Sequence, residues 1–192
     1  NIEKAILLGH SIGGKVAMRF AYDFPEKVEK LFIAVIEPKD YLLLKEEIQF
    51  YLNQNILLAM QEINFSKINS RSDVDDFMAQ KIDDERIRKF LLKNVAKDKA
   101  HNQYKWRVNA GVLYDHLDEI VSGVNKNWLE ERAPIMSYPV IFIRGMKSKY
   151  ILPEDETLIK EIYPDARIVD IPEAGHWLHA EQPRKFMKAV ML

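Results

Sequence analysis

The segment that most constrains the fold is AILLGHSIGGKVAMRFA, at residues 5–21. Ile6 to Leu8 form an apolar run typical of a short buried strand, and Ile12 to Phe24 show the spacing of a helix that stops before Pro25. Between them stands GHSIG, residues 9–13, with no room for a loop. The segment therefore predicts a buried strand that turns sharply into a helix, with a serine on the turn.

The turn matches the G-x-S-x-G pattern, in which a serine sits on a strained strand-to-helix turn that exposes its hydroxyl. Glycines at 9 and 13 are expected to keep the turn free of clashes. The start of the helix presents free N–H groups to negative charge, so Ser11 is a candidate nucleophile and the Ile12 N–H a candidate oxyanion donor. The alternative is a glycine-rich turn with a merely exposed serine.

Further apolar runs alternate with helical patterns, which predicts an α/β fold with a parallel sheet and helices on both faces. Strands are expected at 31–36, 140–144 and 167–171, and a helix at 154–163. The apolar spacing between Pro38 and Ala133 is mostly helical. We therefore expect a core at residues 1–37, a helical cap at 38–133, and a return to the core at 134–192.

Composition narrows the classes of partner. Apolar residues make up 47% of the 192-residue chain, and the net charge of −1 argues against a nucleic-acid partner. No apolar run reaches the ~18–20 residues of a membrane span, and the front lacks a secretory signal, so cytoplasm is the default location. The absence of cysteine excludes disulfides and thiolate metal sites. We expect no metal and no cofactor, and the oligomeric state stays open.

A serine nucleophile needs a base, and His176 is the best placed of the five histidines. It follows the last predicted strand in the loop PEAGHWLHAEQP, so it can lie over the same sheet edge as Ser11. His179 is expected to pack or to face solvent, and a metal site formed by His176 and His179 lacks a supporting third ligand. The remaining three histidines, His10, His101 and His116, need not act.

Three segments carry a resemblance: GHSIGGKVAMRFA…FPEKVEKLFIAV, VIFIRGMKSKYI and IPEAGHWLHAEQPRKF. Together they are similar to the α/β-hydrolase superfamily, in the branch of the small YbfF-type esterases and their mitochondrial abhydrolase-domain relatives. The resemblance implies hydrolysis of an acyl ester or thioester through a serine acyl-enzyme, with His176 as base and then acid. It also implies that early strands and a second oxyanion loop precede Asn1, in a protein roughly 60–80 residues longer.

The third member of the implied triad departs from the family pattern. Ser148 stands where many members carry an aspartate, and the branch instead takes its acid from the strand after the nucleophile helix, where this chain has Val35. Glu37, two residues on, would leave the strand on the same face, so it is the predicted acid. Asp40 and Asp155 are outside candidates.

Residues beside the predicted catalytic loops are the candidates for a substrate pocket. Met146, Tyr150 and Trp177 belong to this set, and Trp106 is the candidate from the cap. Further cap aromatics, more often core than contact, are Tyr41, Tyr104, Tyr114 and Trp128. Two rival functions remain open: another serine hydrolase chemistry, such as C–C hydrolase or lactonase, and a non-catalytic binding scaffold.

Overall fold

The computed structural model describes residues 2–39, 48–122, 131 and 133–191. These residues form two compact units, one made of Asn1–Leu42 with Ser122–Leu192 and the other of Leu43–Val121. The second unit lies inside the segment predicted as a cap, and we call it the inserted unit. The first unit is called the core unit.

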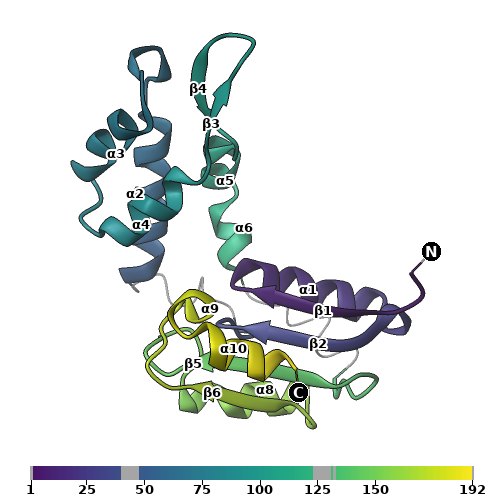
Figure 1. Cartoon of the computed structure of the whole chain (residues 1–192). Helices are drawn as coiled ribbons and strands as arrows, with labels where there is room; N and C mark the ends of the chain where they lie inside the picture. The colour runs from purple at the N-terminus through teal and green to yellow at the C-terminus, as the bar shows by residue number, and fades with distance from the viewer. Residues whose placement is uncertain (1, 40–47, 123–130, 132, 192) are drawn as a thin grey trace. The chain divides into compact units, whose positions relative to one another are not determined.

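The core unit is built on a parallel four-stranded sheet in the order β1–β2–β5–β6 (Figure 1). The strands span Ala5–His10 (β1), Val28–Ala34 (β2), Val140–Gly145 (β5) and Arg167–Ile171 (β6). His10 pairs with Ala34 and Ala34 with Ile143, so the carboxyl ends of these strands lie at one edge. That edge is where open α/β sheets place their ligands. The predicted α/β fold is confirmed.

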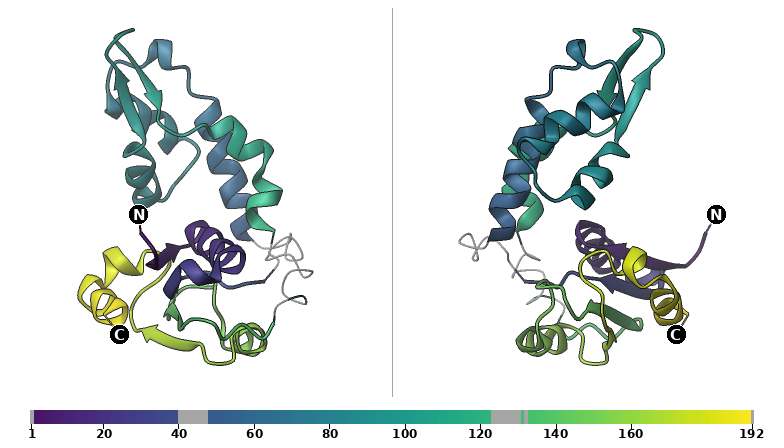
Figure 2. Two further views of the ribbon diagram at one scale, coloured as in Figure 1. Left: turned by 90° about the vertical axis from the view of Figure 1, so that its right-hand side faces the viewer. Right: turned by 60° about the vertical axis from the view of Figure 1, so that its left-hand side comes forward.

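Helices cover both faces of this sheet. On one face lie α1 (Ile12–Asp23) and α8 (Glu156–Ile162), which follows a 3₁₀ turn at Pro153–Asp155. On the other lie α9 (Leu178–Glu181) and α10 (Pro183–Val190). Figure 2 shows α10 and α1 on different sides of the strands. A sheet covered in this way needs strands that are apolar on both faces, which explains the unbroken apolar runs of β2 and β5.

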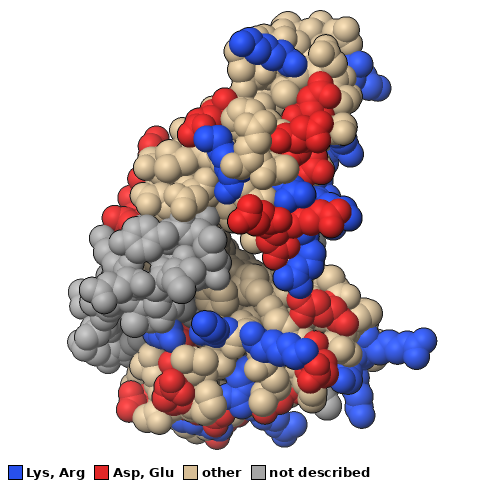
Figure 3. Space-filling view, turned by 90° about the vertical axis from the view of Figure 1, so that its left-hand side faces the viewer, with Lys and Arg blue, Asp and Glu red and all other residues tan. Residues whose placement is uncertain are grey.

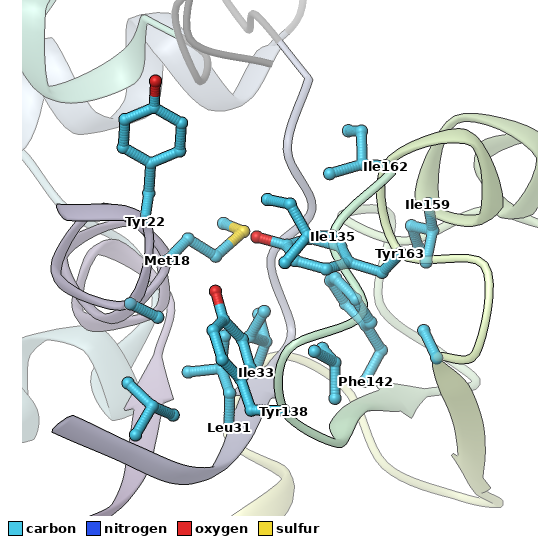
Figure 4. Close-up of a cluster of buried hydrophobic side chains, with 14 of the residues drawn as sticks. Met18, Tyr22, Leu31, Ile33, Ile135, Tyr138, Phe142, Ile159, Ile162 and Tyr163 are labelled. Carbon is cyan, nitrogen blue, oxygen red and sulfur yellow. The ribbon is translucent and has the colours of Figure 1, made fainter. Parts of the chain in front are cut away.

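The alternation of side chains along β2 and β5 divides the core into two clusters. Leu31, Ile33 and Phe142 face α1 and α8, where they pack with Met18 and Tyr163 (Figure 4). The intervening side chains pack toward α9 and α10, and the buried members on that face are Phe32, Ala34, Ile141, Ile143, Ile171, Ala174, Leu178 and Ala189. Two layers of buried apolar side chains therefore hold the strand ends in register.

One edge of the sheet is apolar and uncovered within the described part of the chain. β1 pairs only with β2 there, and its Ile6 and Leu8 are 55% and 50% exposed. Val16 and Phe20 of α1 are exposed as well. An exposed apolar edge strand readily pairs with other chains.

The inserted unit is mostly helical but contains an antiparallel hairpin that the periodicity did not predict. Its helices are α2 (Ile48–Gln61), α3 (Arg71–Ala79), α4 (Glu85–Leu92), α5 (Ala110–Asp115) and α6 (Leu117–Val121). The hairpin joins β3 (Val95–Asp98) to β4 (Gln103–Trp106). Its strands are only four residues long, too short for an alternating pattern to stand out from a helical one.

No helix in the described ranges is long and apolar enough to cross a membrane. Figure 3 shows basic and acidic side chains interspersed on the face that it presents. That mixture agrees with the net charge of −1. A polyanion partner would instead require an extended surface of basic side chains.

Candidate active site

Ser11 occupies the strained turn that the sequence predicts between β1 and α1. Its backbone angles are φ 54° and ψ −126°, a conformation that non-glycine residues rarely adopt. Its N–H donates to the Ala34 carbonyl over 2.9 Å, which fixes the turn to the end of β2. Strain of this kind persists only where the surroundings enforce it, and it is the geometry of a nucleophile elbow.

Of the two glycines expected to avoid clashes at the turn, Gly9 has that role and Gly13 does not. A Cβ at Gly9 would lie 2.2 Å from the Gly13 carbonyl oxygen, whereas a Cβ at Gly13 would meet nothing described within 4 Å. A Cβ at Gly14 would lie 2.4 Å from the Ile36 side chain. The turn therefore needs Gly9 for its backbone contact, and Gly14 lets α1 approach β2. The expectation that Gly13 must be small to avoid a clash is wrong for the described residues.

Ile12 is the first residue of α1. The first N–H groups of a helix have no acceptor within the helix and carry the positive end of its dipole. The Ile12 N–H follows Ser11 directly, so it can receive negative charge that develops on an atom bound to Ser11.

His176 lies in the loop between β6 and α9, and a hydrogen bond connects it to the strand of Ser11. His10, the last residue of β1, has its Nε2 2.7 Å from the His176 carbonyl oxygen. The two rings are 5.0 Å apart between centroids, and the Tyr150 ring is 4.5 Å from the His176 ring. The loop that holds the predicted base therefore reaches the residue next to the predicted nucleophile.

The surroundings of His176 favour the neutral imidazole. Burial, with smaller effects from His10 and His179, lowers the pKa of His176 to about 4. Its Nδ1 is buried and has no hydrogen-bond partner among the described residues. Within the described residues, no hydrogen bond joins Ser11 Oγ to His176. Hydrogen bonds between a nucleophile and its base often form only when substrate is bound.

Glu37 is fully buried beyond the end of β2, but the structure does not bring it to His176. Its carboxylate forms an ion pair with Lys39, whose Nζ is 2.6 Å from Oε1, and Lys39 also lies 3.3 Å from Asp155. Burial raises the pKa of Glu37 to about 8, although the Lys39 ammonium opposes this rise. The role of Glu37 as the orienting acid stays a prediction.

Val35 is also unusual. It is fully buried at the end of β2 with φ 54°, a rare conformation for a β-branched residue. It belongs to a buried cluster that includes Ala174, two residues before His176, and Tyr150 packs against that cluster. Ser148, at the other position where an aspartate was expected, accepts the Tyr150 N–H over 3.3 Å. Asp40 lies outside the described residues.

The candidate pocket residues fall in both units. In the core unit Met146 is exposed, Tyr150 stacks near His176, and Trp177 is the N-terminal cap residue of α9. In the inserted unit Trp106 donates its indole N–H to the Met60 carbonyl over 2.8 Å and packs against Phe65. Tyr41 and Trp128 lie outside the described residues.

Sequence reasoning passed over His10, which was treated as a motif residue without a role. The sequence contained one indication of a role: His10 precedes Ser11 at the end of a predicted strand. A residue at the carboxyl end of such a strand lies at the edge where ligands bind. Its partner is 166 residues away, so no local pattern could show the contact. Over the described ranges, no group of histidine and carboxylate side chains could hold a metal ion.

Comparison with known proteins shows the family of the chain. The model of the alpha/beta hydrolase fold family matches residues 1–183. The chain is 31% identical over 195 residues to an sn-1-specific diacylglycerol lipase, ABHD11 of Danio rerio, covering 100% of this chain and 57% of that protein. It is 30% identical over 189 residues to the esterase YbfF of Escherichia coli (strain K12), covering 98% and 66%.

Among solved structures, a marine microorganism esterase superposes with a TM-score of 0.90 at 35% identity, over 98% of this chain and 69% of that one. The chain spans a little over half the length of the diacylglycerol lipase and about two-thirds of the bacterial esterase.

Proposed function

The chain belongs to the alpha/beta hydrolase family, and from that premise we propose that it hydrolyses carboxylic esters through an acyl-enzyme on Ser11. The observation that carries the proposal is the strained conformation of Ser11 at the ligand edge of the sheet, beside a loop that holds a half-buried histidine whose pKa is lowered to about 4. The names of the relatives, esterase and lipase, support the same bond type.

In the proposed reaction Ser11 Oγ attacks the ester carbonyl carbon, and its proton passes to the ring of His176. The carbonyl oxygen becomes an oxyanion that accepts the Ile12 N–H. Collapse of this intermediate breaks the bond to the alcohol, which leaves with the proton from His176. A water molecule then attacks the acyl-enzyme with His176 again as base, and Ser11 is regenerated.

The buried Nδ1 of His176 has a consequence for rate. A carboxylate at that atom fixes the tautomer and stabilises the imidazolium, and its loss in a serine protease costs ~10⁴ in kcat. We therefore expect slow but measurable turnover. The lack of a partner for Nδ1 among the described residues also favours the alternative hypothesis of a non-catalytic binding scaffold, which predicts no turnover.

Finer features belong to the same proposal. The leaving group is an alcohol or a thiol, the inserted unit serves as the substrate-selecting cap, and the protein works in the cytoplasm. Met146, Tyr150, Trp177 and Trp106 are the proposed substrate contacts. Since relatives are named diacylglycerol lipases, a diacylglycerol is the first lipid ester to assay beside a p-nitrophenyl ester and an acyl thioester.

Labelling with a fluorophosphonate tests the proposal. Wild type is expected to be modified at Ser11, identified by peptide mass, and to hydrolyse p-nitrophenyl esters; Ser11→Ala should lose both properties while keeping its melting temperature. Ser66→Ala, on a serine of the inserted unit, is the matched control. A folded wild type that is neither labelled nor active would favour the scaffold, and turnover of β-diketones in place of esters would favour a C–C hydrolase.

A further inference from the structure

We propose that His10 is a positioning residue for His176, taking over the orienting role that a carboxylate on Nδ1 would otherwise have. The proposal rests on the proposed function, since it concerns how the base of that reaction is held. His10 would act through His176, without contacting the Ser11 hydroxyl or transferring a proton to the substrate.

The hydrogen bond between the two histidines has a fixed direction. A carbonyl oxygen can only accept, so His10 Nε2 carries the proton and donates it to the His176 carbonyl over 2.7 Å. His10 also ends β1 and precedes Ser11, whose own N–H is bound to Ala34. The bond therefore ties the backbone of the base to the strand that carries the nucleophile.

The rest of the loop does not provide this connection. Ala174 accepts the Lys147 N–H and Gly175 donates to the Glu181 carboxylate of α9, so neither of these hydrogen bonds reaches β1. Among the described residues, the bond from His10 is the one hydrogen bond made by His176 itself. Because β1 and β6 are the two outer strands of the described sheet, the loop after β6 crosses the ligand edge, and this bond fastens that loop to the end of β1.

Ring contacts add orientation to the backbone bond. The His10 ring lies 5.0 Å from the His176 ring and, edge-on, 4.9 Å from the His179 ring, which in turn contacts Phe186 of α10 at 6.2 Å. Tyr150 contacts the His176 ring at 4.5 Å. The His176 ring thus has two ring neighbours, His10 at the end of β1 and Tyr150 in the loop after β5, and an aromatic face such as that of Tyr150 can stabilise the imidazolium that forms during the reaction.

The test separates the donor of His10 from its bulk and its charge. His10→Gln keeps a side-chain N–H at the same reach, while His10→Leu fills the space without a donor. We expect His10→Leu to lower kcat about 10²-fold, the cost of a base misplaced by ~1 Å, with little change in KM and slower fluorophosphonate labelling of Ser11. His10→Gln should retain most of the wild-type kcat, and both variants should keep the wild-type melting temperature.

A second readout follows from the charges around the base, which are His10 on β1 and His179 on α9. Since glutamine cannot become charged, His10→Gln should move the acid limb of kcat/KM toward higher pH, which reports that His10 lies beside the base in the working enzyme. The difference in kcat between His10→Leu and His10→Gln is the readout that separates positioning from a structural role. His101→Gln, at an exposed histidine of the inserted unit bound to Asp98, is the control and should match wild type in every measurement.

Two results would overturn the proposal while leaving the proposed function intact: wild-type kcat in His10→Leu, or equal losses in His10→Leu and His10→Gln. A wild type that fails to label at Ser11 would instead overturn the proposed function. The two failures are therefore distinguishable in one set of measurements.

Discussion

A Cβ atom on Gly9 would lie 2.2 Å from the carbonyl oxygen of Gly13, a distance that no ordinary contact tolerates. The end of β1 and the first turn of α1 approach each other this closely because only one residue, Ser11, separates them. The contact is between backbone atoms, so it cannot be relieved by moving a side chain. The two glycines of the motif are therefore unequal.

The first prediction compares alanine at these two positions. Gly9→Ala should displace the turn and slow labelling of Ser11 at least about 10²-fold, the scale on which misplaced catalytic groups lose rate. Gly13→Ala places its Cβ in open space inside a helix and should stabilise the fold by about 0.5–1 kcal/mol. Labelling rate and melting temperature measure both effects. Equal labelling of the two variants would contradict the steric account.

The second prediction concerns Val35. Its left-handed backbone costs a β-branched residue about 1–2 kcal/mol, whereas aspartate and asparagine tolerate that conformation. Val35→Asp also adds a carboxylate to the cluster that contains Ala174 and against which Tyr150 packs, near a base whose Nδ1 has no hydrogen-bond partner in the described part of the chain. We expect kcat on a p-nitrophenyl ester to rise at least about tenfold.

Val35→Asn is the matched control, because it has the shape and backbone tolerance of aspartate without the charge. It should melt higher than wild type and show no gain in kcat. If the asparagine and aspartate variants gained equally, relief of backbone strain rather than the carboxylate would explain the increase.

The third prediction concerns Glu37. Its pKa is raised from 4.5 to about 8 by burial, so the folded protein holds a proton that the unfolded chain releases. This contribution to stability is complete below pH 4.5 and is lost as the pH rises through 8. Glu37→Gln removes this pH dependence of stability. As the pH rises from 4.5 to 8, the melting temperature of Glu37→Gln should therefore rise relative to that of wild type.

The same variant tests the predicted catalytic role of Glu37. Because Glu37 pairs with Lys39, which also pairs with Asp155, we expect kcat of Glu37→Gln to remain close to that of wild type. A loss approaching ~10⁴-fold would show that Glu37 orients His176 during turnover.

The fourth prediction is the pH profile of the proposed base. A base acts in its neutral form, and burial lowers the pKa of His176 to about 4. The value of kcat/KM for a neutral ester should therefore fall only near pH 4, well below the 6.5 of an unperturbed histidine. A steady-state profile from pH 3.5 upward measures it, and a limb near 6.5 would show that His176 is solvated in the working enzyme.

Much of the core unit could be predicted because its signals are local. The strand predicted at 167–171 has the same bounds in the structure. A short apolar run between turn residues, with a helix before it, indicates a buried strand. The inserted hairpin was missed because four-residue strands carry too little periodicity. The structure also has a break at His116, between α5 and α6, within a pattern that by itself predicts one continuous helix.

The sequence by itself determined the strand–turn–helix around Ser11, the alternation that makes a parallel sheet, and the identity of the candidate nucleophile and base. These depend on neighbours in the chain, where propensity and steric limits act. Only the tertiary structure decided what surrounds His176: the hydrogen bond from His10, the ring of Tyr150, and the pairing of Glu37 with Lys39. Those contacts join residues on separate strands and loops, and their burial, which sets the proton affinities of His176 and Glu37, exists only once the sheet has assembled.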